Sequence, residues 1–240
     1  MKKMELTLIY FWFINLCSCQ QELIEYEKGD IKVYIEQGEQ WLHDFPLFLG
    51  IKKKNPPQIA IWLEDAQGNY LSTVYVTHKI ATQSWQASGG NRRKEALPHW
   101  CYSRGMKYND GLYLPTKKEP LTDGMSGATP HGSFDIKLSP TTALKKFVIK
   151  IEINHSTDFN EAFPKSAQEG EINYSGGEEG SGQPAIVYAA DIDLSSGEKS
   201  FEANLIGHSS PDGSSGEINE DISGLTTALH IVKRITVAIQ

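Results

Sequence analysis

The chain contains little cysteine, and this scarcity excludes several kinds of site. Three cysteines occur in 240 residues, and two of them, Cys17 and Cys19, lie in the N-terminal segment. Cys101 therefore remains alone for the folded domain. One thiol cannot form an intramolecular disulfide, a thiolate zinc site, an iron–sulfur cluster or a C-x-x-C-H haem attachment. Because bulky residues surround Cys101 in the sequence, we expect a buried and unreactive thiol.

Basic charge and internal repetition are also scarce. The chain carries 23 Lys and Arg against 30 Asp and Glu, which gives a formal net charge of -7. A protein that binds nucleic acid needs a basic surface to neutralise phosphates, so we exclude DNA and RNA as partners. No segment repeats at a fixed period, which argues against solenoids and propellers. The 7 histidines include no H-x-x-x-H pair, so neither a metal site nor a zinc enzyme is predicted.

No apolar run is long enough to cross a bilayer as a helix. The main candidate, residues 6–16, is apolar apart from Thr7 and Asn15 and follows the basic pair Lys2 and Lys3. A basic region followed by a short apolar region is typical of an export signal. We therefore expect the protein to work outside the cytoplasm.

The apolar run ends in Leu16-Cys17-Ser18-Cys19, which resembles the lipobox of bacterial lipoproteins. The resemblance implies cleavage before Cys19 and lipidation of Cys19. Residues 1–18 would then be a lipoprotein signal peptide, residues 19–30 a polar tether and residues 31–240 the β-sandwich domain. The expected location is extracytoplasmic and membrane-anchored, in the periplasm or at the cell surface. An ordinary secretory signal or an uncleaved anchor is the alternative.

Alternation of apolar and polar residues dominates the rest of the chain. In residues 147–154, four apolar side chains share one face, and the polar side chains Lys150, Glu152 and Asn154 share the other. This pattern predicts a half-buried strand. Further strands are predicted at residues 31–36, 59–64, 70–76, 133–138, 185–194, 201–206 and 231–239. Helical pattern is confined to a turn or two in residues 92–102 and 222–229. We predict an all-β fold, an immunoglobulin-like or related antiparallel β-sandwich of about eight strands with minor helical turns.

Several other segments are weak candidates for a site. Residues 154–161 offer oxygen ligands for calcium but lack the twelve-residue loop pattern, so a solvated turn is favoured. Residues 175–182 and 209–216 are rich in glycine and serine and are interpreted as flexible spacers. Four tryptophans could form a glycan platform, but packing into the core is the favoured alternative. They are Trp41, Trp62, Trp85 and Trp100.

The most specific motif runs from Asp123 to Thr129. It resembles the motif at which extracytoplasmic flavin transferases attach FMN: Asp, two variable residues, Ser or Thr, Gly, Ala, then Ser or Thr. All five constrained positions match: Asp123, Ser126, Gly127, Ala128 and Thr129. The resemblance implies a phosphoester between the Thr129 hydroxyl and FMN. Gly127 and Ala128 have almost no side chain, which would leave the backbone accessible to the transferase.

A purely structural interpretation of the same motif is also open. Residues 123–132 would form a tight loop ahead of the predicted strand at residues 133–138, with Asp123 capping backbone N–H groups. In that case the glycines and the hydroxyl side chains would serve the turn, and no flavin would be attached.

A wider resemblance covers roughly residues 31–154. Four parts of the chain are similar to a family of predicted periplasmic proteins of unknown function: the segment Pro57-Gln58-Ile59-Ala60-Ile61-Trp62-Leu63-Glu64-Asp65, the hairpin after it, a region near Trp100 and the D-x-x-S-G-A-T loop. The resemblance implies a sandwich-like β domain. It also implies an electron-transfer setting, because members occur with flavin transferases and membrane redox proteins. The family supplies no catalytic residues.

These observations predict an extracytoplasmic lipoprotein that carries covalent FMN and transfers electrons. Its expected partners are a flavin transferase, membrane redox proteins and the membrane itself through the lipid anchor. FMN would supply the electron chemistry, and the protein would supply tethering and orientation. The alternative is a cofactor-free binding module for a protein or a glycan at the surface or in the periplasm. In either case we expect a carrier or binding protein rather than an enzyme.

Overall fold

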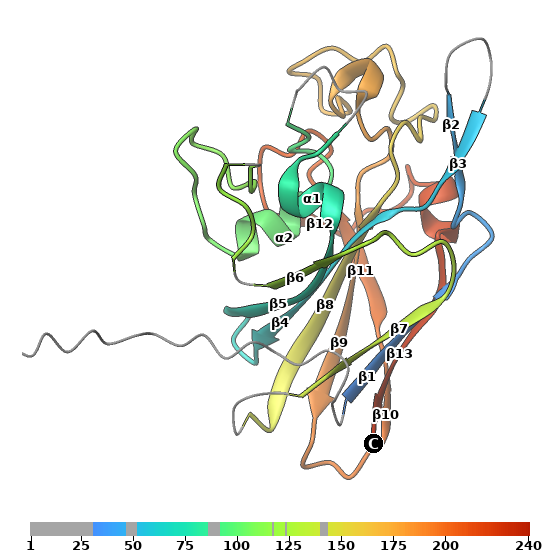
Figure 1. Ribbon diagram of the computed structural model, residues 1–240. Coiled ribbons are helices and arrows are strands. Elements are labelled where there is room, and N and C mark those ends of the chain that lie inside the picture. The colour runs from blue at the N-terminus through green and yellow to red at the C-terminus, as the bar shows by residue number, and fades with distance from the viewer. Residues whose placement is uncertain (1–30, 47–51, 86–91, 117, 123, 140–143) are drawn as a thin grey trace, which may run out of the picture.

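Two β-sheets pack face to face in the computed structural model, which describes residues 31–46, 52–85, 92–116, 118–122, 124–139 and 144–240 (Figure 1). The smaller sheet has the strand order β10 (Ser200–Glu202), β13 (Val232–Ile239), β1 (Ile31–Gln37) and β7 (Phe134–Leu138). The larger sheet has the order β12 (Ile218–Asn219), β11 (Asn204–Ser209), β9 (Ile186–Asp193), β8 (Lys146–Asn154), β4 (Gln58–Asp65), β5 (Tyr70–Thr77) and β6 (Gly124–Gly127). A separate hairpin joins β2 (His43–Pro46) to β3 (Lys52–Asn55).

The all-β sandwich predicted from the sequence is confirmed, and the described residues form 13 strands, more than the eight expected. The additional strands are short pieces such as β2, β3, β6 and β12. Strand pairs in the described residues are antiparallel, apart from β6, which runs parallel to β5. The predicted signal peptide and tether, residues 1–30, lie outside the described residues.

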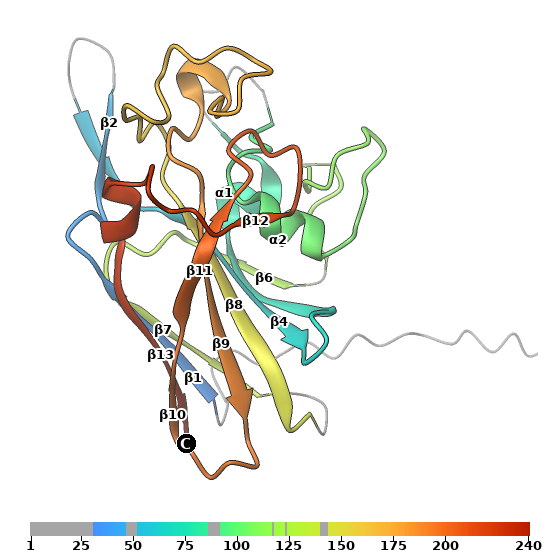
Figure 2. The same cartoon turned by 180° about the vertical axis from the view of Figure 1, so that it is seen from behind.

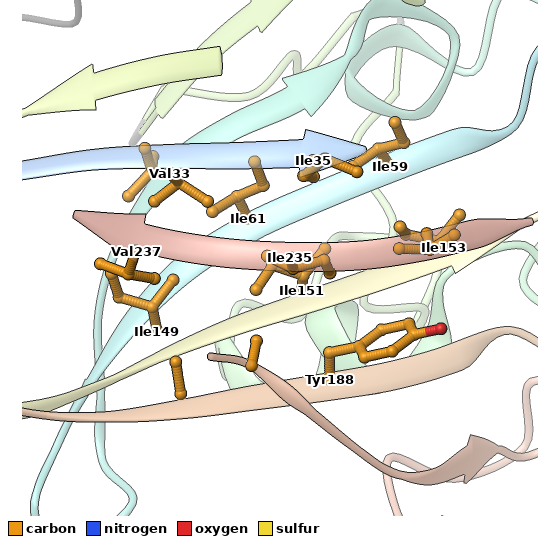
Figure 3. Close-up of a cluster of buried hydrophobic side chains, with 14 of the residues drawn as sticks. Val33, Ile35, Ile59, Ile61, Ile149, Ile151, Ile153, Tyr188, Ile235 and Val237 are labelled. Carbon is orange, nitrogen blue, oxygen red and sulfur yellow. The ribbon is translucent and has the colours of Figure 1, made fainter. Parts of the chain in front are cut away.

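The main core lies between the two sheets. Ile149, Ile151 and Ile153 on β8 project toward the smaller sheet and are fully buried. They belong to the same buried cluster as Ile35 of β1 and Ile235 of β13 (Figure 3). The period-two pattern of β8 therefore produces the apolar face that the sequence predicts.

A second core covers the outer face of the larger sheet. The helices α1 (His78–Thr82) and α2 (Pro98–Ser103) lie on that face, away from the smaller sheet (Figures 1 and 2). Trp62 and Trp100 are fully buried there, and Trp41 is buried between the sheets. Packing rather than a glycan platform is therefore confirmed for these three tryptophans. α2 lies where a helical turn is expected, whereas α1 is not predicted.

The prediction that β8 is half-buried is wrong in one respect. Its polar face is covered by other segments and is not exposed to solvent. Glu152 and Asn154 are buried beneath α2 and the segment before it, and Lys150 is only partly exposed. β8 is thus a central strand that is covered on both faces. Its polar residues are tolerated because each meets a partner at the covering segment.

The strand predicted at residues 201–206 is in fact two strands in different sheets. β10 pairs with β13 in the smaller sheet, and β11 pairs with β9 in the larger one. The chain crosses between the sheets at Ala203, which is buried and whose N–H donates to Ile235 O at 3.0 Å. A small side chain fits this crossing, because the two sheets approach each other there.

Residues 175–182, interpreted as a flexible spacer, have a defined geometry instead. A short 3₁₀ helix, Gly177–Glu179, lies within this segment. Elsewhere in the chain, a second 3₁₀ helix, Thr227–His230, lies near the turn predicted at residues 222–229. Ser181 is fully buried and accepts a hydrogen bond from Arg93 Nη2 at 3.2 Å. The Gly182 N–H donates to Ser175 Oγ at 3.1 Å. Hydrogen bonds rather than apolar packing hold this segment, which explains why its composition is misleading.

Candidate functional site

The motif that resembles a flavin-attachment site lies at the edge of the larger sheet. Residues Gly124–Gly127 form β6, the last strand of that sheet, and Gly124 and Ser126 pair with Thr73 and Val76 of β5. The tight loop proposed as a structural alternative is therefore wrong for these four residues. Ser126 is exposed, and so is Ala128 just after the strand, while Thr129 is half-buried. Asp123 and the predicted lipidation site Cys19 lie outside the described residues.

Two glycines of β6 are required by close contacts with β5. A Cβ atom on Gly124 would lie 2.6 Å from Thr73 Cβ, and one on Gly127 would lie 2.8 Å from Tyr75 Cε2. Both distances are shorter than real carbon–carbon contacts. Glycine is the residue that permits such an approach within a strand. Gly127 therefore has a packing role in addition to any role in the motif.

Two aromatic side chains hold the backbone on either side of Thr129. The Tyr75 hydroxyl donates to Ala128 O at 2.7 Å, and Trp41 Nε1 donates to Pro130 O at 3.1 Å. Burial raises the pKa of Tyr75 to about 12, so its hydroxyl stays protonated and available as a donor. Because Tyr75 belongs to the larger sheet and Trp41 packs in the core against the smaller one, the acceptor residue is held between the two sheets.

A groove of about 350 Å³ opens beside this segment. Its two walls are the edge strands of the two sheets, β6 and β7, which lie on the same side of the sandwich (Figure 1). The lining residues are Tyr75, Met125, Ser126, Gly127, Ala128, Pro130, Phe134, Asp135 and Ile136. The volume lies at the lower end of the range for small-molecule sites, roughly 300–1,000 Å³.

Aromatic rings form the floor of the groove. The ring centroids of Tyr75 and Phe134 lie 6.0 Å apart, and those of Trp41 and Phe134 lie 6.2 Å apart. The charged residue of the lining is Asp135, whose carboxylate pairs with Lys32 at 3.1 Å on the solvent side. An apolar aromatic floor with one carboxylate at its rim suits a flat, largely apolar ligand better than a phosphate.

A buried polar cluster on the other face of the larger sheet is a feature that the sequence analysis missed. Lys150 Nζ lies 3.1 Å from Glu64 Oε2 and 3.1 Å from His99 Nε2. His99 Nδ1 lies 2.6 Å from Gly216 O, so Nδ1 carries the proton and Nε2 accepts from the lysine. Burial lowers the pKa of His99, which keeps its ring neutral.

Glu152 lies beside this cluster and anchors α2. Its two carboxyl oxygens accept hydrogen bonds from the backbone N–H groups of His99 at 3.1 Å and Trp100 at 2.7 Å. These belong to the first turn of α2, where N–H groups lack partners inside the helix. Burial raises the pKa of Glu152 to about 7. Because these polar atoms satisfy one another, we interpret the cluster as a structural connection between α2 and the sheet.

The solvated turn expected at residues 154–161 is wrong. Asp158 is buried and accepts hydrogen bonds from Thr227 Oγ1 at 2.6 Å and Gln183 Nε2 at 2.9 Å. His155 is also buried and bonds to Gln40 O at 2.8 Å. The segment thus connects β8 to the C-terminal part of the chain. Within the described ranges, no three His, Cys, Asp or Glu side chains are grouped to hold a metal ion.

The expectation for Cys101 is confirmed, since the thiol is buried and burial raises its pKa.

Comparisons with protein-family models, with curated proteins and with solved structures give no match. Among the residues that the structure covers, no helix is long and apolar enough to span a bilayer. The groove and the segment that ends at Thr129 are therefore the features that bear on function.

Proposed function

We propose that this chain is an extracytoplasmic lipoprotein that carries FMN on Thr129 and exchanges electrons with membrane redox partners. The observation that carries the proposal is the position of the acceptor. Thr129 follows an edge strand in which Met125 and Ser126 are exposed, and its two neighbours, Ala128 and Pro130, line an aromatic groove. A separate enzyme must reach the acceptor hydroxyl, and an edge strand with small side chains offers that access.

The attachment step needs no catalytic residue on this chain. Thr129 Oγ attacks the phosphorus atom of the FMN half of FAD, the pyrophosphate P–O bond breaks, and AMP leaves. The hydroxyl proton passes to a base of the transferase, because a threonine hydroxyl is a weak nucleophile on its own. The products are the phosphoester on Thr129 and free AMP.

The described residues fit the group in two respects. The phosphate would be joined at the half-buried Thr129, near solvent, where its charge stays hydrated. The aromatic floor made by Tyr75 and Phe134 lies directly beside it. When bound, FMN supplies one-electron and two-electron chemistry, and the chain supplies the position and surroundings of the flavin.

A second candidate function, a cofactor-free binding module, is favoured by a different observation. β6 and β7 are both edge strands, and each leaves one side of its backbone without a strand neighbour within the described residues. An extended peptide can add to such an edge by main-chain hydrogen bonds. The partner would then be a protein, since main-chain pairing needs a peptide backbone. Of the four tryptophans considered for a glycan platform, Trp41, Trp62 and Trp100 are buried and Trp85 is half-buried.

Co-expression of the full chain with a flavin transferase tests the proposal. We expect the wild type to gain the mass of one FMN and to fluoresce in a denaturing gel, since a phosphoester survives unfolding. Thr129→Ala should lose both signals. Thr122→Ala, which removes an exposed hydroxyl outside the motif, is the matched control and should be labelled like the wild type. Equal labelling of Thr129→Ala, or no labelling of the wild type by a transferase active on another target, would refute the proposal and favour the binding module.

The lipid anchor has its own test. Because Cys19 is the predicted lipidated residue, Cys19→Ala should release the protein from the membrane fraction or stall its processing. Cys17→Ala is the control, since this residue would be removed with the signal peptide. Unchanged fractionation of Cys19→Ala, with no acyl mass on the wild-type N-terminal peptide, would exclude lipidation.

A further inference from the structure

We propose that the groove between β6 and β7 holds the isoalloxazine ring of the flavin, so that the ring closes the open edge of the sandwich. This inference rests on the proposed attachment at Thr129. It assigns a binding role to two residues that are not among the five constrained motif positions, Met125 at a variable position of the motif and Phe134 on β7.

The first argument is proximity. Ala128 and Pro130 line the groove, and Thr129 stands between them in the chain. The ribityl phosphate that joins the ring to the threonine is short. Thr129 itself is not among the lining residues, so the ribityl phosphate must carry the ring from the acceptor into the groove, and the alternative position of the ring is the solvent beside it.

The second argument is the chemistry of the groove. Met125 is 41% exposed and Phe134 is half-buried, so apolar surface at this edge faces water. An isoalloxazine ring is flat and largely apolar on its faces. Placing it over Phe134 and Met125 removes apolar surface from water on both partners, and stacked aromatic rings gain further from their geometry.

The third argument is rigidity. The hydrogen bonds from Tyr75 to Ala128 O and from Trp41 to Pro130 O fix the backbone on both sides of the acceptor. The groove wall is therefore formed before any flavin is attached. A preformed site loses little conformational entropy when its ligand binds, which favours the ring inside the groove over the ring in solvent.

The fourth argument concerns the edges themselves. β6 and β7 are the end strands of their sheets within the described residues, and edge strands are prone to pair with other chains. A ring bound between them would cover part of both edges. Attachment of the flavin would thereby compete with addition of a peptide at the same place.

The experiment uses the full flavinylated chain and measures how well iodide quenches the flavin fluorescence. In the native wild type we expect quenching several-fold weaker than after denaturation, because the groove shields the ring. Met125→Glu should raise the quenching of the native protein toward the denatured value. Leu71→Glu on β5 is the matched control, since Leu71 is 40% exposed against 41% for Met125 and does not line the groove.

A second pair of variants covers the case in which Met125→Glu disturbs β6. Phe134→Leu should also increase quenching, whereas Phe201→Leu should not. Both phenylalanines are partly buried on strands of the smaller sheet and pack against the same core, but only Phe134 lines the groove. Thermal melting of each variant confirms that it is folded.

Intact mass separates the two proposals. If the wild type carries the mass of one FMN, Thr129→Ala does not, and iodide quenches the wild type equally in the native and denatured states, the ring lies in solvent. That result overturns the groove assignment and leaves the attachment intact. If no FMN mass is found with an active transferase, the proposed function fails and this inference fails with it.

Discussion

The hydroxyl of Tyr75 donates a hydrogen bond of 2.7 Å to the carbonyl oxygen of Ala128, which lies 53 positions further along the chain. A Cβ atom at position 127 would lie 2.8 Å from Cε2 of the same ring, so a larger residue there would displace the tyrosine. One side chain thus determines both the path of β6 and the position of the residue before Thr129. A motif that looks like a free loop in the sequence is therefore a fixed edge of the sheet.

Removing this hydroxyl should have a small and specific cost. Tyr75→Phe loses one hydrogen bond, and water can replace it at the exposed Ala128, so we expect a loss of about 0.5–1.5 kcal/mol in the free energy of unfolding. Tyr34→Phe, on the outer face of β1, should change the free energy of unfolding by less than about 0.5 kcal/mol. Urea unfolding of both variants checks this. Equal losses for the two would mean that the bond to Ala128 contributes nothing.

Because Lys150 and Glu64 form an ion pair, we predict that replacing Lys150 strongly lowers the stability of the fold. The sequence pattern alone suggests a small effect on stability. Lys150→Met leaves the buried Glu64 carboxylate without its cation, and we expect a loss of about 3–5 kcal/mol in the free energy of unfolding. Adding Glu64→Gln should recover much of that loss. For comparison, Ile151→Ala on the core face of the same strand should cost about 2–5 kcal/mol.

A matched control lies at the start of the same strand. Lys146 pairs with Asp193 at 3.0 Å, close to the 3.1 Å of the buried pair, but its side chain is 64% exposed. Lys146→Met should therefore cost about 0–1 kcal/mol. If denaturant unfolding gives the same loss for Lys146→Met and Lys150→Met, burial does not strengthen the inner pair.

We predict that the contribution of Glu152 to the stability of the fold falls as the pH rises. Its pKa is raised by burial from the ordinary 4.5 to about 7 in the folded protein. Between these values the folded state keeps a proton that the unfolded state has lost, so folding is favoured at the acidic end. The stability contributed by the protonated carboxyl is present below about pH 4.5 and is lost as the pH approaches 7.

Comparison with Glu152→Gln isolates the contribution of this carboxyl group. The stability of the wild type relative to the variant should decrease as the pH rises from about 4.5 to about 7, by a few kcal/mol at most. Urea unfolding of both proteins at several pH values measures this difference in stability. A difference that stays constant over this range, or that increases, would contradict the raised pKa.

The predictable part of the fold is the part that local pattern determines. The apolar alternation of β8, β1 and β4 reports directly which side chains face the core, because successive residues of a strand point to opposite faces. The strand at residues 147–154 is therefore found with its core face correct. The single buried thiol is predicted for a related reason, since Cys101 has bulky neighbours.

The burial of the second face of β8 could not be predicted from its own residues. Lys150 and Glu152 look like a solvated edge until α2, from residues some fifty positions earlier, covers them. The helix brings the donors and the acceptor that make their burial tolerable. The same holds for Asp158, whose partners Gln183 and Thr227 come from distant segments.

The candidate site was found in the sequence only in part. The five motif positions are local and can be recognised in one stretch, but β6 has few residues that favour strands, so a loop was expected. The strand forms because β5 supplies partners and because Gly124 and Gly127 allow close packing. The groove residues Phe134 and Tyr75 give no signal, since only the fold brings them beside Thr129.

The most direct test of the account is a peptide mass map of the full-length protein isolated from its own host. We predict that the peptide containing Thr129 carries the mass of one FMN, with fragment ions placing it on that residue. Finding the peptide unmodified, in a host whose flavin transferase labels another protein, would contradict the flavin assignment.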